Sequence, residues 1–349
     1  MSETKSKIIL IGAIDKGHNP TNGETMKNQL FIRRFHELFA KVIAIDTLNW
    51  RKRPWVLIRI FFVLLFNRQT KVIISSSVAA SYLISFLYYV PLCNYVYFWV
   101  VGGNLHLGIA QGKYNIKALK KLTHIIVQGQ SMVNELNKVG LSNAIYVPNS
   151  KPIIYSPKIR PHKADKPYRF VFLSRVHPDK GITDITAAAQ KLIQEGYGNK
   201  FSIDFYGQIA SGYSDMFMTL ISGVDNVNYC GYLNLLDNDG YQKLSEYDVM
   251  LFPTYWSGEG FPGIVIDANI AGLPIIATDW NLNKSVIEDG KTGFIIPVHD
   301  SNALAMRMMN IIDQTVDLHE MKKNCVQYVQ QFDFRRVLSE ELMRKIKLY

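Results

Sequence analysis

The most constraining feature of the sequence is a series of alternating strand-like and helix-like segments that occurs twice, on either side of a proline-rich stretch. The first series begins at residues 7–14 (KIILIGAI) and the second at residues 168–175 (YRFVFLSR). Residues 151–167 between them contain four prolines and no regular periodicity, which is typical of an interdomain linker. Strands that alternate with helices predict a mostly parallel sheet covered on both faces. The sequence therefore predicts an α/β protein with two Rossmann-like domains facing each other across a cleft.

The length supports this division, because 349 residues are too many for one typical α/β domain and suit two. We place the first domain at residues 1–152, the linker at 153–167 and the second domain at 168–332. The three cysteines are widely spaced and form no CxxC pair, which argues against a disulfide framework and a zinc site. No signal peptide is visible, so we expect a cytoplasmic protein.

Two apolar stretches raise the question of a membrane span. Residues 55–66 are too short to cross a bilayer and contain Arg59. Residues 78–101 are long enough, but they include polar side chains and a central Pro91. We therefore expect a helix that ends near Tyr89, followed by a buried strand.

The most informative motif lies in residues 257–293, where a glycine-bracketed turn follows an apolar strand. Pro262 stands where a helix is expected to begin, and Gly272 where it ends. The start of such a helix offers free N–H groups and a positive dipole end, which suit a pyrophosphate. Glu259 precedes this helix and Asp267 lies within it. These carboxylates can accept hydrogen bonds from the hydroxyls of a sugar and a ribose.

Three further loops follow predicted strands. Arg175 and Lys180 flank a turn after the strand at 168–175, where two cations can neutralise a diphosphate leaving group. The loop after the first strand contains Gly23 beside Asn22, and its glycines allow a ligand to approach closely. This loop is not GxGxxG, so no dinucleotide cofactor is indicated. His106 follows the strand that ends at residue 101, and it is a candidate catalytic residue beside a purely structural alternative.

Residues 257–293 resemble the signature of glycosyltransferase family 4, a family of retaining enzymes with the GT-B fold. The family has Glu-x7-Glu where this chain has Glu259-x7-Asp267. The resemblance implies that Glu259 contacts the donor sugar, that Asp267 contacts the ribose and that Arg175 and Lys180 clamp the pyrophosphate. It also implies a last helix, at residues 333–349, that crosses back to the first domain. The implied donor-binding residues are Gly23, Asn22, Arg175, Lys180, Glu259, Gly260, Phe261, Pro262, Gly263, Ile264 and Asp267.

The resemblance is incomplete at three positions. The second acid is an aspartate, one methylene shorter than the family's glutamate, and Ser174 replaces a glycine before Arg175. A histidine that faces the reacting sugar in many members has only His106, a few residues further on, as its counterpart. These departures put the ribose contact and the role of His106 in question.

By this resemblance the chain is a retaining hexosyltransferase that uses a nucleotide-sugar donor, with UDP as the commonest nucleotide in the family. The implied acceptor is a glycan or lipid-linked glycan, as in the biosynthesis of bacterial capsule, exopolysaccharide or lipopolysaccharide. We expect no cofactor and a metal-independent reaction, because residues 237–239 (DND) do not follow a strand end and are expected in an exposed turn. Two alternatives remain: a nucleotide-sugar hydrolase or phosphorylase, and a non-catalytic sugar-nucleotide-binding subunit that supports a partner transferase.

Charge is distributed unevenly along the chain. Residues 1–150 hold 18 Lys and Arg against six Asp and Glu, whereas residues 151–349 hold 21 and 23. The basic half suits an anionic membrane surface, a phosphate-bearing acceptor or nucleic acid, but no nucleic-acid-binding frame is present. Residues 50–66 combine cations with an apolar, aromatic face, as in an interfacial helix. We therefore expect peripheral association with the inner face of the plasma membrane, with a core helix as the alternative.

Overall fold

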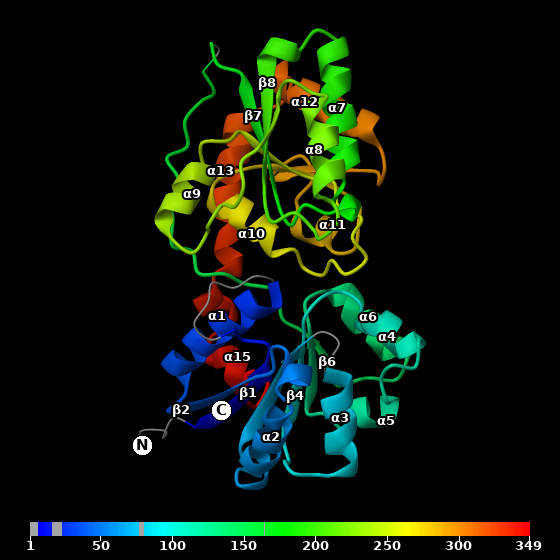
Figure 1. The fold of residues 1–349 in the computed structure, drawn as a ribbon. Coiled ribbons are helices and arrows are strands. Elements are labelled where there is room, and N and C mark those ends of the chain that lie inside the picture. Colours follow the sequence, from blue (N-terminus) through cyan, green and yellow to red (C-terminus); the bar gives the residue numbers. More distant parts are fainter. Residues whose placement is uncertain (1–5, 16–22, 77–79, 164) are drawn as a thin grey trace. The chain divides into compact units, whose positions relative to one another are not determined.

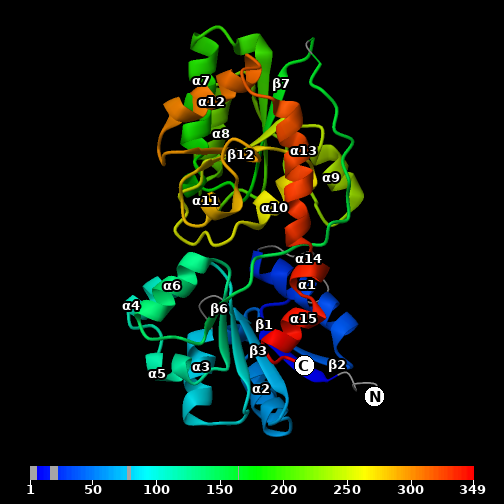
Figure 2. The same cartoon turned by 180° about the vertical axis from the view of Figure 1, so that it is seen from behind.

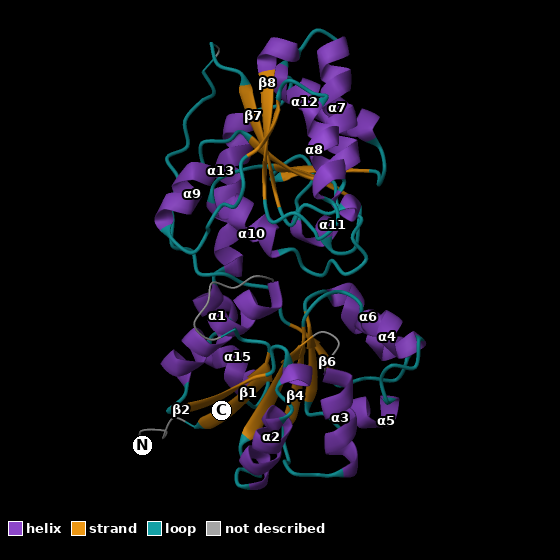
Figure 3. Cartoon of the chain, viewed as in Figure 1, coloured by secondary structure: helices purple, strands orange, loops and turns teal. Residues whose placement is uncertain are grey.

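The computed structural model describes residues 6–15, 23–76, 80–163 and 165–349. The chain divides into two compact units, one formed by Met1–Asn149 with Phe334–Tyr349 and the other by Ser150–Asp333. Figure 1 shows these units with their elements labelled, and Figure 3 shows that each contains one sheet between helices. We call them unit 1 and unit 2.

Unit 1 is built on a parallel six-stranded sheet with the order β2-β1-β3-β4-β5-β6 among the described residues. The four inner strands, β1, β3, β4 and β5, are short and almost wholly buried because helices cover both faces. The strands are β1 (Lys7–Gly12), β2 (Lys41–Asp46), β3 (Lys71–Ser76), β4 (Val96–Val100), β5 (His124–Val127) and β6 (Ala144–Tyr146). The helices are α1 (Gly23–Leu38), α2 (Trp55–Leu65), α3 (Ala80–Tyr89), α4 (Leu105–Ala110), α5 (Ile116–Lys120), α6 (Gln130–Lys138), α14 (Phe334–Val337) and α15 (Glu340–Lys345).

The two faces of this sheet are covered by different helices. Side chains of α1 and of the C-terminal segment form one apolar core with alternate residues of the strands. Within that core, the Tyr97 hydroxyl donates to the backbone carbonyl of Lys347 over 2.7 Å. Figure 2 shows α1 and α15 together on this face, and α2 and α3 lie on the other. The last residues of the chain are therefore an integral part of unit 1.

Unit 2 repeats the architecture with a parallel sheet of order β12-β11-β10-β7-β8-β9 among the described residues. Helices α7, α8 and α12 cover one face through a large apolar core, and α9 and α10 lie on the other (Figure 1). The strands are β7 (Tyr168–Leu173), β8 (Phe201–Tyr206), β9 (Val227–Tyr229), β10 (Val249–Phe252), β11 (Ile275–Thr278) and β12 (Gly293–Ile296). The helices are α7 (Ile182–Gln194), α8 (Ser214–Ser222), α9 (Asn238–Leu244), α10 (Gly263–Ile270), α11 (Asn283–Val286), α12 (Ser301–Ile312) and α13 (Leu318–Tyr328).

The structure confirms the expected fold class of two Rossmann-like domains, and it corrects two details. The C-terminal segment is two short helices and not one, because Ser339 caps α15 by accepting from the Leu342 N–H over 3.2 Å. Strand β12 was not predicted. The expected helix ending near Tyr89 and the strand after it are α3 and β4. No helix in the described ranges is both long and apolar enough to cross a membrane.

Candidate active site

The candidate site lies in unit 2 at the carboxyl ends of β7 and β10. In parallel sheets of this kind, ligands bind outside the carboxyl ends of the strands, where the loops to the following helices converge. The loop after β7 carries Arg175 and Lys180, and the loop after β10 carries Glu259. The structure thus brings together, at one sheet edge, Lys180 and Glu259, which the sequence separates by 79 residues.

A tight approach of these two loops is made possible by Gly181. This residue adopts a left-handed conformation (φ 75°) at the end of a 3-10 turn formed by Pro178–Lys180. A Cβ at Gly181 would lie 2.2 Å from the carbonyl oxygen of Pro253, at the start of the loop after β10. Glycine is therefore required here on two grounds, its backbone conformation and the contact between the loops.

The Lys180 amine forms an ion pair with the Glu259 carboxylate. Both side chains are largely buried, with 9% of Lys180 and 14% of Glu259 exposed. The Thr254 hydroxyl lies 3.4 Å from the same carboxylate oxygen, and the Lys180 amine also lies 5.5 Å from the ring centre of Phe252. Because isolated charges are costly to bury, each member of the pair makes burial of the other tolerable.

Arg175 stands beside this pair, against an aromatic ring. Its guanidinium carbon lies 5.1 Å from the ring centre of Trp256, a cation–π contact, and the ring of His177 meets the same indole edge-on at 4.7 Å. No hydrogen bond or ion pair of the Arg175 guanidinium is found among the described residues. Arg175 is exposed, so its N–H donors are available to an anion.

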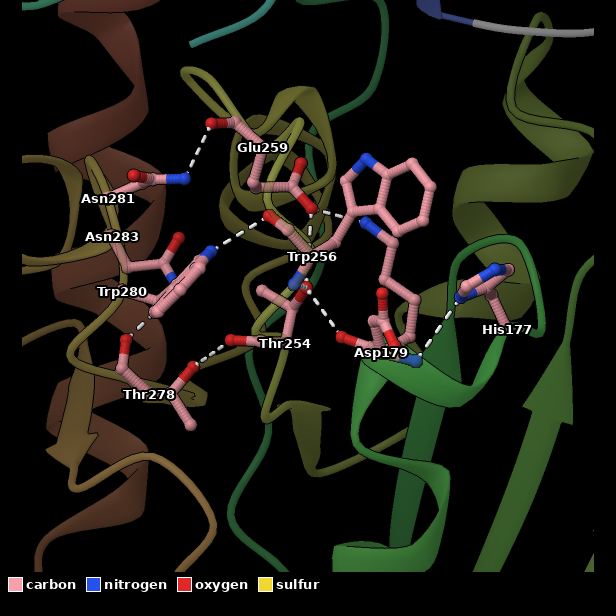
Figure 4. Close-up of polar contacts among 10 residues, drawn as sticks. His177, Asp179, Thr254, Trp256, Glu259, Thr278, Trp280, Asn281 and Asn283 are labelled. Carbon is pink, nitrogen blue, oxygen red and sulfur yellow. Dashed lines mark hydrogen bonds and ion pairs between the residues drawn. The ribbon is translucent and has the colours of Figure 1, made fainter. Parts of the chain in front are cut away.

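The backbone of the Glu259 loop is fixed from the next strand, as Figure 4 shows. The Asn281 amide donates to the carbonyl of Glu259 over 2.9 Å, and the Trp280 indole donates to the carbonyl of Trp256 over 2.8 Å. The Thr278 hydroxyl donates to the carbonyl of Thr254. The loop carrying Glu259 is thus held by side chains as well as by its own turn, which presets the position of the carboxylate.

The loop continues into α10, whose first turn faces the same edge. Pro262 occupies the N-cap and Gly263 is the first helical residue, one position later than the sequence predicts. Gly260, Phe261 and Pro262 are buried, and the Phe261 ring packs edge-on against Phe332 at 5.3 Å. Gly263 and Ile264 are partly exposed. The first N–H groups of a helix lack intrahelical acceptors, so this end of α10 can receive an anion.

Asp267 is buried and bonded to protein groups, whereas the family resemblance implies that it contacts the ribose. It is 2% exposed, and one carboxylate oxygen accepts from the Tyr241 hydroxyl over 2.7 Å. The other oxygen pairs with the Lys151 amine. Burial and the neighbouring carboxylate raise the pKa of the Tyr241 phenol far above its usual range. Both oxygens of Asp267 are therefore occupied by protein groups, and the ribose contact stays a prediction.

The candidate residues of unit 1 are only partly described. Gly23 begins α1, is exposed, and a Cβ added there would meet no heavy atom within 4 Å. The internal packing of unit 1 therefore does not require glycine at this position. His106 is exposed on α4, and Asn22 lies outside the described residues. The roles of Gly23, Asn22 and His106 in binding or catalysis therefore stay predictions.

Residues 237–239 begin a helix and do not form an exposed turn. Asp237 is the N-cap of α9, where its carboxylate accepts from the Gly240 N–H and from the Asn234 amide, each over 3.0 Å. This corrects the expected turn, although the three residues are exposed as expected. No group of three or more His, Cys, Asp or Glu side chains that could hold a metal ion occurs in the described part of the chain.

Sequence reasoning missed Trp256, Tyr241 and Lys151. An aromatic residue in the loop after a predicted strand was a readable signal for Trp256, because such rings commonly contact ligands or cations. Lys151 and Tyr241 carried no comparable signal, since they meet Asp267 across 116 and 26 residues of sequence.

Comparison with solved structures identifies the class of fold. The apo form of a lipopolysaccharide outer core galactosyltransferase, WaaB, matches 99% of this chain and 100% of its own, with a TM-score of 0.72 at 14% identity. The Anabaena protein HepE in complex with UDP-glucose matches 98% of each chain, with a TM-score of 0.70 at 13% identity. The chain has the GT-B fold of two Rossmann-like domains that glycosyltransferases of this kind share.

Sequence comparison is more specific for unit 2. The model of the family Glycosyl transferases group 1 matches residues 167–314, which include Arg175, Lys180 and Glu259. The match covers most of unit 2 but less than half of the whole chain. A UDP-Gal:α-D-GlcNAc-diphosphoundecaprenol α-1,3-galactosyltransferase of Escherichia coli is 25% identical over 158 residues, 45% of this chain and 39% of that protein. The match thus spans less than half the length of such relatives.

Proposed function

We propose that the protein is a retaining, metal-independent glycosyltransferase that transfers a hexosyl group from a nucleotide sugar to an acceptor. The observation that carries this proposal is the ion pair between Lys180 and Glu259 beside an exposed Arg175, within the part of the chain that matches group 1. Two cations at the amino end of α10 match the charge of a diphosphate, and a carboxylate beside them matches sugar hydroxyls.

The geometry suggests the order in which these residues act during the reaction. Without donor, the charge of Lys180 is neutralised by Glu259. A donor diphosphate competes for the Lys180 amine, and its capture leaves the Glu259 carboxylate free to accept hydrogen bonds from the sugar. Arg175 takes up the charge that develops on the leaving diphosphate. The bond between the anomeric carbon and the phosphate oxygen breaks, and the acceptor hydroxyl attacks that carbon from the same face while its proton passes to the departing phosphate oxygen. The anomeric configuration is therefore retained.

The substrates are proposed from the chain's relatives. UDP is the proposed nucleotide, because the E. coli relative is a UDP-Gal transferase and HepE was solved with UDP-glucose. The proposed acceptor is a glycan carried on a lipid diphosphate, as the name of that relative states for its own acceptor. We place the reaction in the assembly of a bacterial cell-surface polysaccharide, at the cytoplasmic face of the membrane, with peripheral attachment through the basic unit 1.

The test compares Glu259→Gln with the wild type. The variant keeps the side-chain volume but removes the charge, so we expect kcat to fall by about 100- to 1,000-fold. Glu246→Gln is the matched control, because Glu246 is an exposed, ion-paired glutamate that precedes β10 at the opposite sheet edge. Equal transfer rates for wild type and Glu259→Gln would refute the proposal.

Two readouts separate the remaining alternatives. Binding is measured as thermal stabilisation by UDP-, GDP- and ADP-sugars, and turnover as transfer to a lipid-diphosphate glycan. Stabilisation without turnover would favour the non-catalytic subunit, and free sugar or sugar phosphate as the main product would favour a hydrolase or phosphorylase. A product with inverted anomeric configuration by NMR would contradict retention.

A further inference from the structure

Unit 1 contains an apolar pocket that the donor site does not use. Its volume is about 280 Å³, and it lies at the carboxyl ends of β1, β2 and β3, beneath α2 and α3. This is close to the lower end of the range of small-molecule pockets, about 300–1,000 Å³. Its walls are mostly aromatic and aliphatic: Trp50, Leu57, Ile60, Tyr82, Leu83 and Phe86.

The helices around the pocket also expose apolar side chains to the outside. Phe66 is 78% exposed, Ile58 60% and Trp55 54% on or beside α2, and Tyr89 is 72% exposed at the end of α3. Scattered single apolar residues are common on protein surfaces, but a whole exposed stripe marks a binding surface. Trp55, Ile58, Phe62 and Phe66 form such a stripe, because their spacing of three and four residues places them on one side of α2. The surface around the pocket is therefore apolar, as is the pocket itself.

The charge of this region identifies the chemistry of the occupant. Residues 47–134, which include α2, α3 and the whole pocket beyond β1, contain ten Lys and Arg and no Asp or Glu. Arg51 and Lys52 are exposed directly before α2, and the Arg51 guanidinium carbon lies 5.7 Å from the ring centre of Trp50, a pocket residue. Asp46, next to the pocket residue Thr47, is paired with Arg53 over 3.6 Å. A protein partner would also be attracted to the apolar surface, but the excess of cations over carboxylates favours an anionic lipid.

We propose that this pocket binds the apolar chain of the lipid that carries the acceptor, while the adjacent cations contact its phosphate. The inference rests on the proposed function, because it names the substrate class of the acceptor site. The pocket holds about nine times the volume that one water molecule occupies in the liquid, about 30 Å³, so it takes the first segment of the chain. The rest of the chain lies in the bilayer, against the exposed residues of α2 and α3.

The position of the pocket fits this role. It opens at the sheet edge where parallel α/β domains bind their ligands, so a chain seated there places its phosphate at that edge. Trp50 and Arg51 are consecutive residues that contribute a ring to the pocket and a cation to the surface. One ligand with an apolar chain and a phosphate would satisfy both.

The test uses the full chain and farnesyl phosphate, with isopentenyl phosphate and inorganic phosphate as probes that share the anion but shorten or remove the chain. Each buried methylene contributes about fourfold to affinity, so we expect farnesyl phosphate to bind at least tenfold more tightly than isopentenyl phosphate by calorimetry. Equal affinities for the two, or no binding of farnesyl phosphate to the folded wild type, would overturn the proposal.

Two variants locate the site. Leu83→Trp fills the pocket and is expected to weaken farnesyl phosphate binding at least tenfold, and Leu57→Ser, which makes the wall polar, provides a second variant if the first fails to fold. Val139→Ser is the matched control, because Val139 is an exposed apolar residue of unit 1 that follows α6 and does not line the pocket. We expect it to change farnesyl phosphate affinity less than twofold. Loss of binding in Val139→Ser with retention in both pocket variants would place the chain elsewhere.

Failure of this inference can be distinguished from failure of the proposed function. Stabilisation by a UDP-sugar reports on unit 2, so a wild type that binds donor but not farnesyl phosphate refutes only the lipid pocket. The converse result would remove the proposed function and leave a lipid-binding unit 1. A concentration-dependent dimer in light scattering that farnesyl phosphate does not dissociate would assign the surface to a second copy of the chain instead.

Discussion

The buried ion pair between Lys151 and Asp267 gives a prediction that separates structural from ligand-binding roles for Asp267. In the structure, Lys151 is the second residue of unit 2 and its amine reaches the middle of α10. The Asp267 side chain is 3% exposed, whereas that of Lys151 is 17% exposed. Lys151→Met would remove the cation and leave the carboxylate with Tyr241 as its one remaining hydrogen-bonding partner among those described.

The expected loss of stability in Lys151→Met follows from the difference in exposure between the two side chains. Removing one partner of a buried ion pair destabilises a protein by about 3–5 kcal/mol, because an uncompensated charge stays buried. Since water can approach on the side of Lys151, we expect the lower end, about 3 kcal/mol. With a urea m-value of about 1–3 kcal/mol/M, the transition midpoint should fall by about 1–3 M. Asp267→Asn should cost less, because the partly exposed Lys151 can be hydrated.

The assay is urea denaturation followed by far-UV circular dichroism, together with titration of a UDP-sugar into each variant. We expect Lys151→Met to be less stable than Asp267→Asn and the two variants to keep donor affinity within about threefold. The reasoning is refuted if Asp267→Asn keeps its stability and loses tenfold or more in donor affinity. That result would show a carboxylate that contacts the ribose, as the family resemblance implies.

Three further predictions concern other parts of the molecule. Burial lowers the pKa of Lys27 to about 7, whereas an unfolded chain keeps it near about 10.4. Between these two values the unfolded state binds more protons than the folded state. Lys27→Met should therefore raise the free energy of unfolding most at or below pH 7, and this gain should shrink by about 1.4 kcal/mol per pH unit up to pH 10. A gain that does not depend on pH would contradict this. Trp256→Leu removes the ring beneath Arg175 and should weaken donor binding about twofold to fivefold by calorimetry, as expected for a cation–π contact of about 0.5–1 kcal/mol. Unchanged affinity would show that the ring does not position the guanidinium. Transfer activity should be the same with EDTA as with manganese, because Arg175 and Lys180 supply the positive charge; loss in EDTA that manganese restores would refute a metal-independent reaction.

Much of unit 2 could be predicted from the sequence because its signals are local. Apolar runs of strand length bounded by glycine and proline define the strands, and a cation or carboxylate just beyond a strand end is carried to the sheet edge by the topology. Arg175, Lys180 and Glu259 all follow strands in this way. Gly272, predicted to end the helix of the motif, has φ 70° directly after the C-cap of α10.

The partners of these residues could not be predicted, because they depend on packing between distant segments. Nothing in the sequence near Asp267 indicates that Lys151 and Tyr241 will occupy both of its oxygens. The break in the C-terminal helix is a different case, since a serine followed by two glutamates at 339–341 is a readable helix start. The family resemblance predicted one helix there, whereas the local signal at Ser339 correctly indicates the start of a second helix.

Helix α2 contains more apolar residues than its packing within the fold buries. Its sequence is apolar almost throughout, which usually predicts a helix buried on all sides. In the structure only Val56, Ile60 and Leu64 are buried, a single stripe with a spacing of four residues. Phe61, Val63 and Leu65 are partly buried, whereas Trp55, Leu57, Ile58 and Phe62 are exposed. These four exposed apolar residues point to a second apolar environment, and they lie on a helix that lines an apolar pocket.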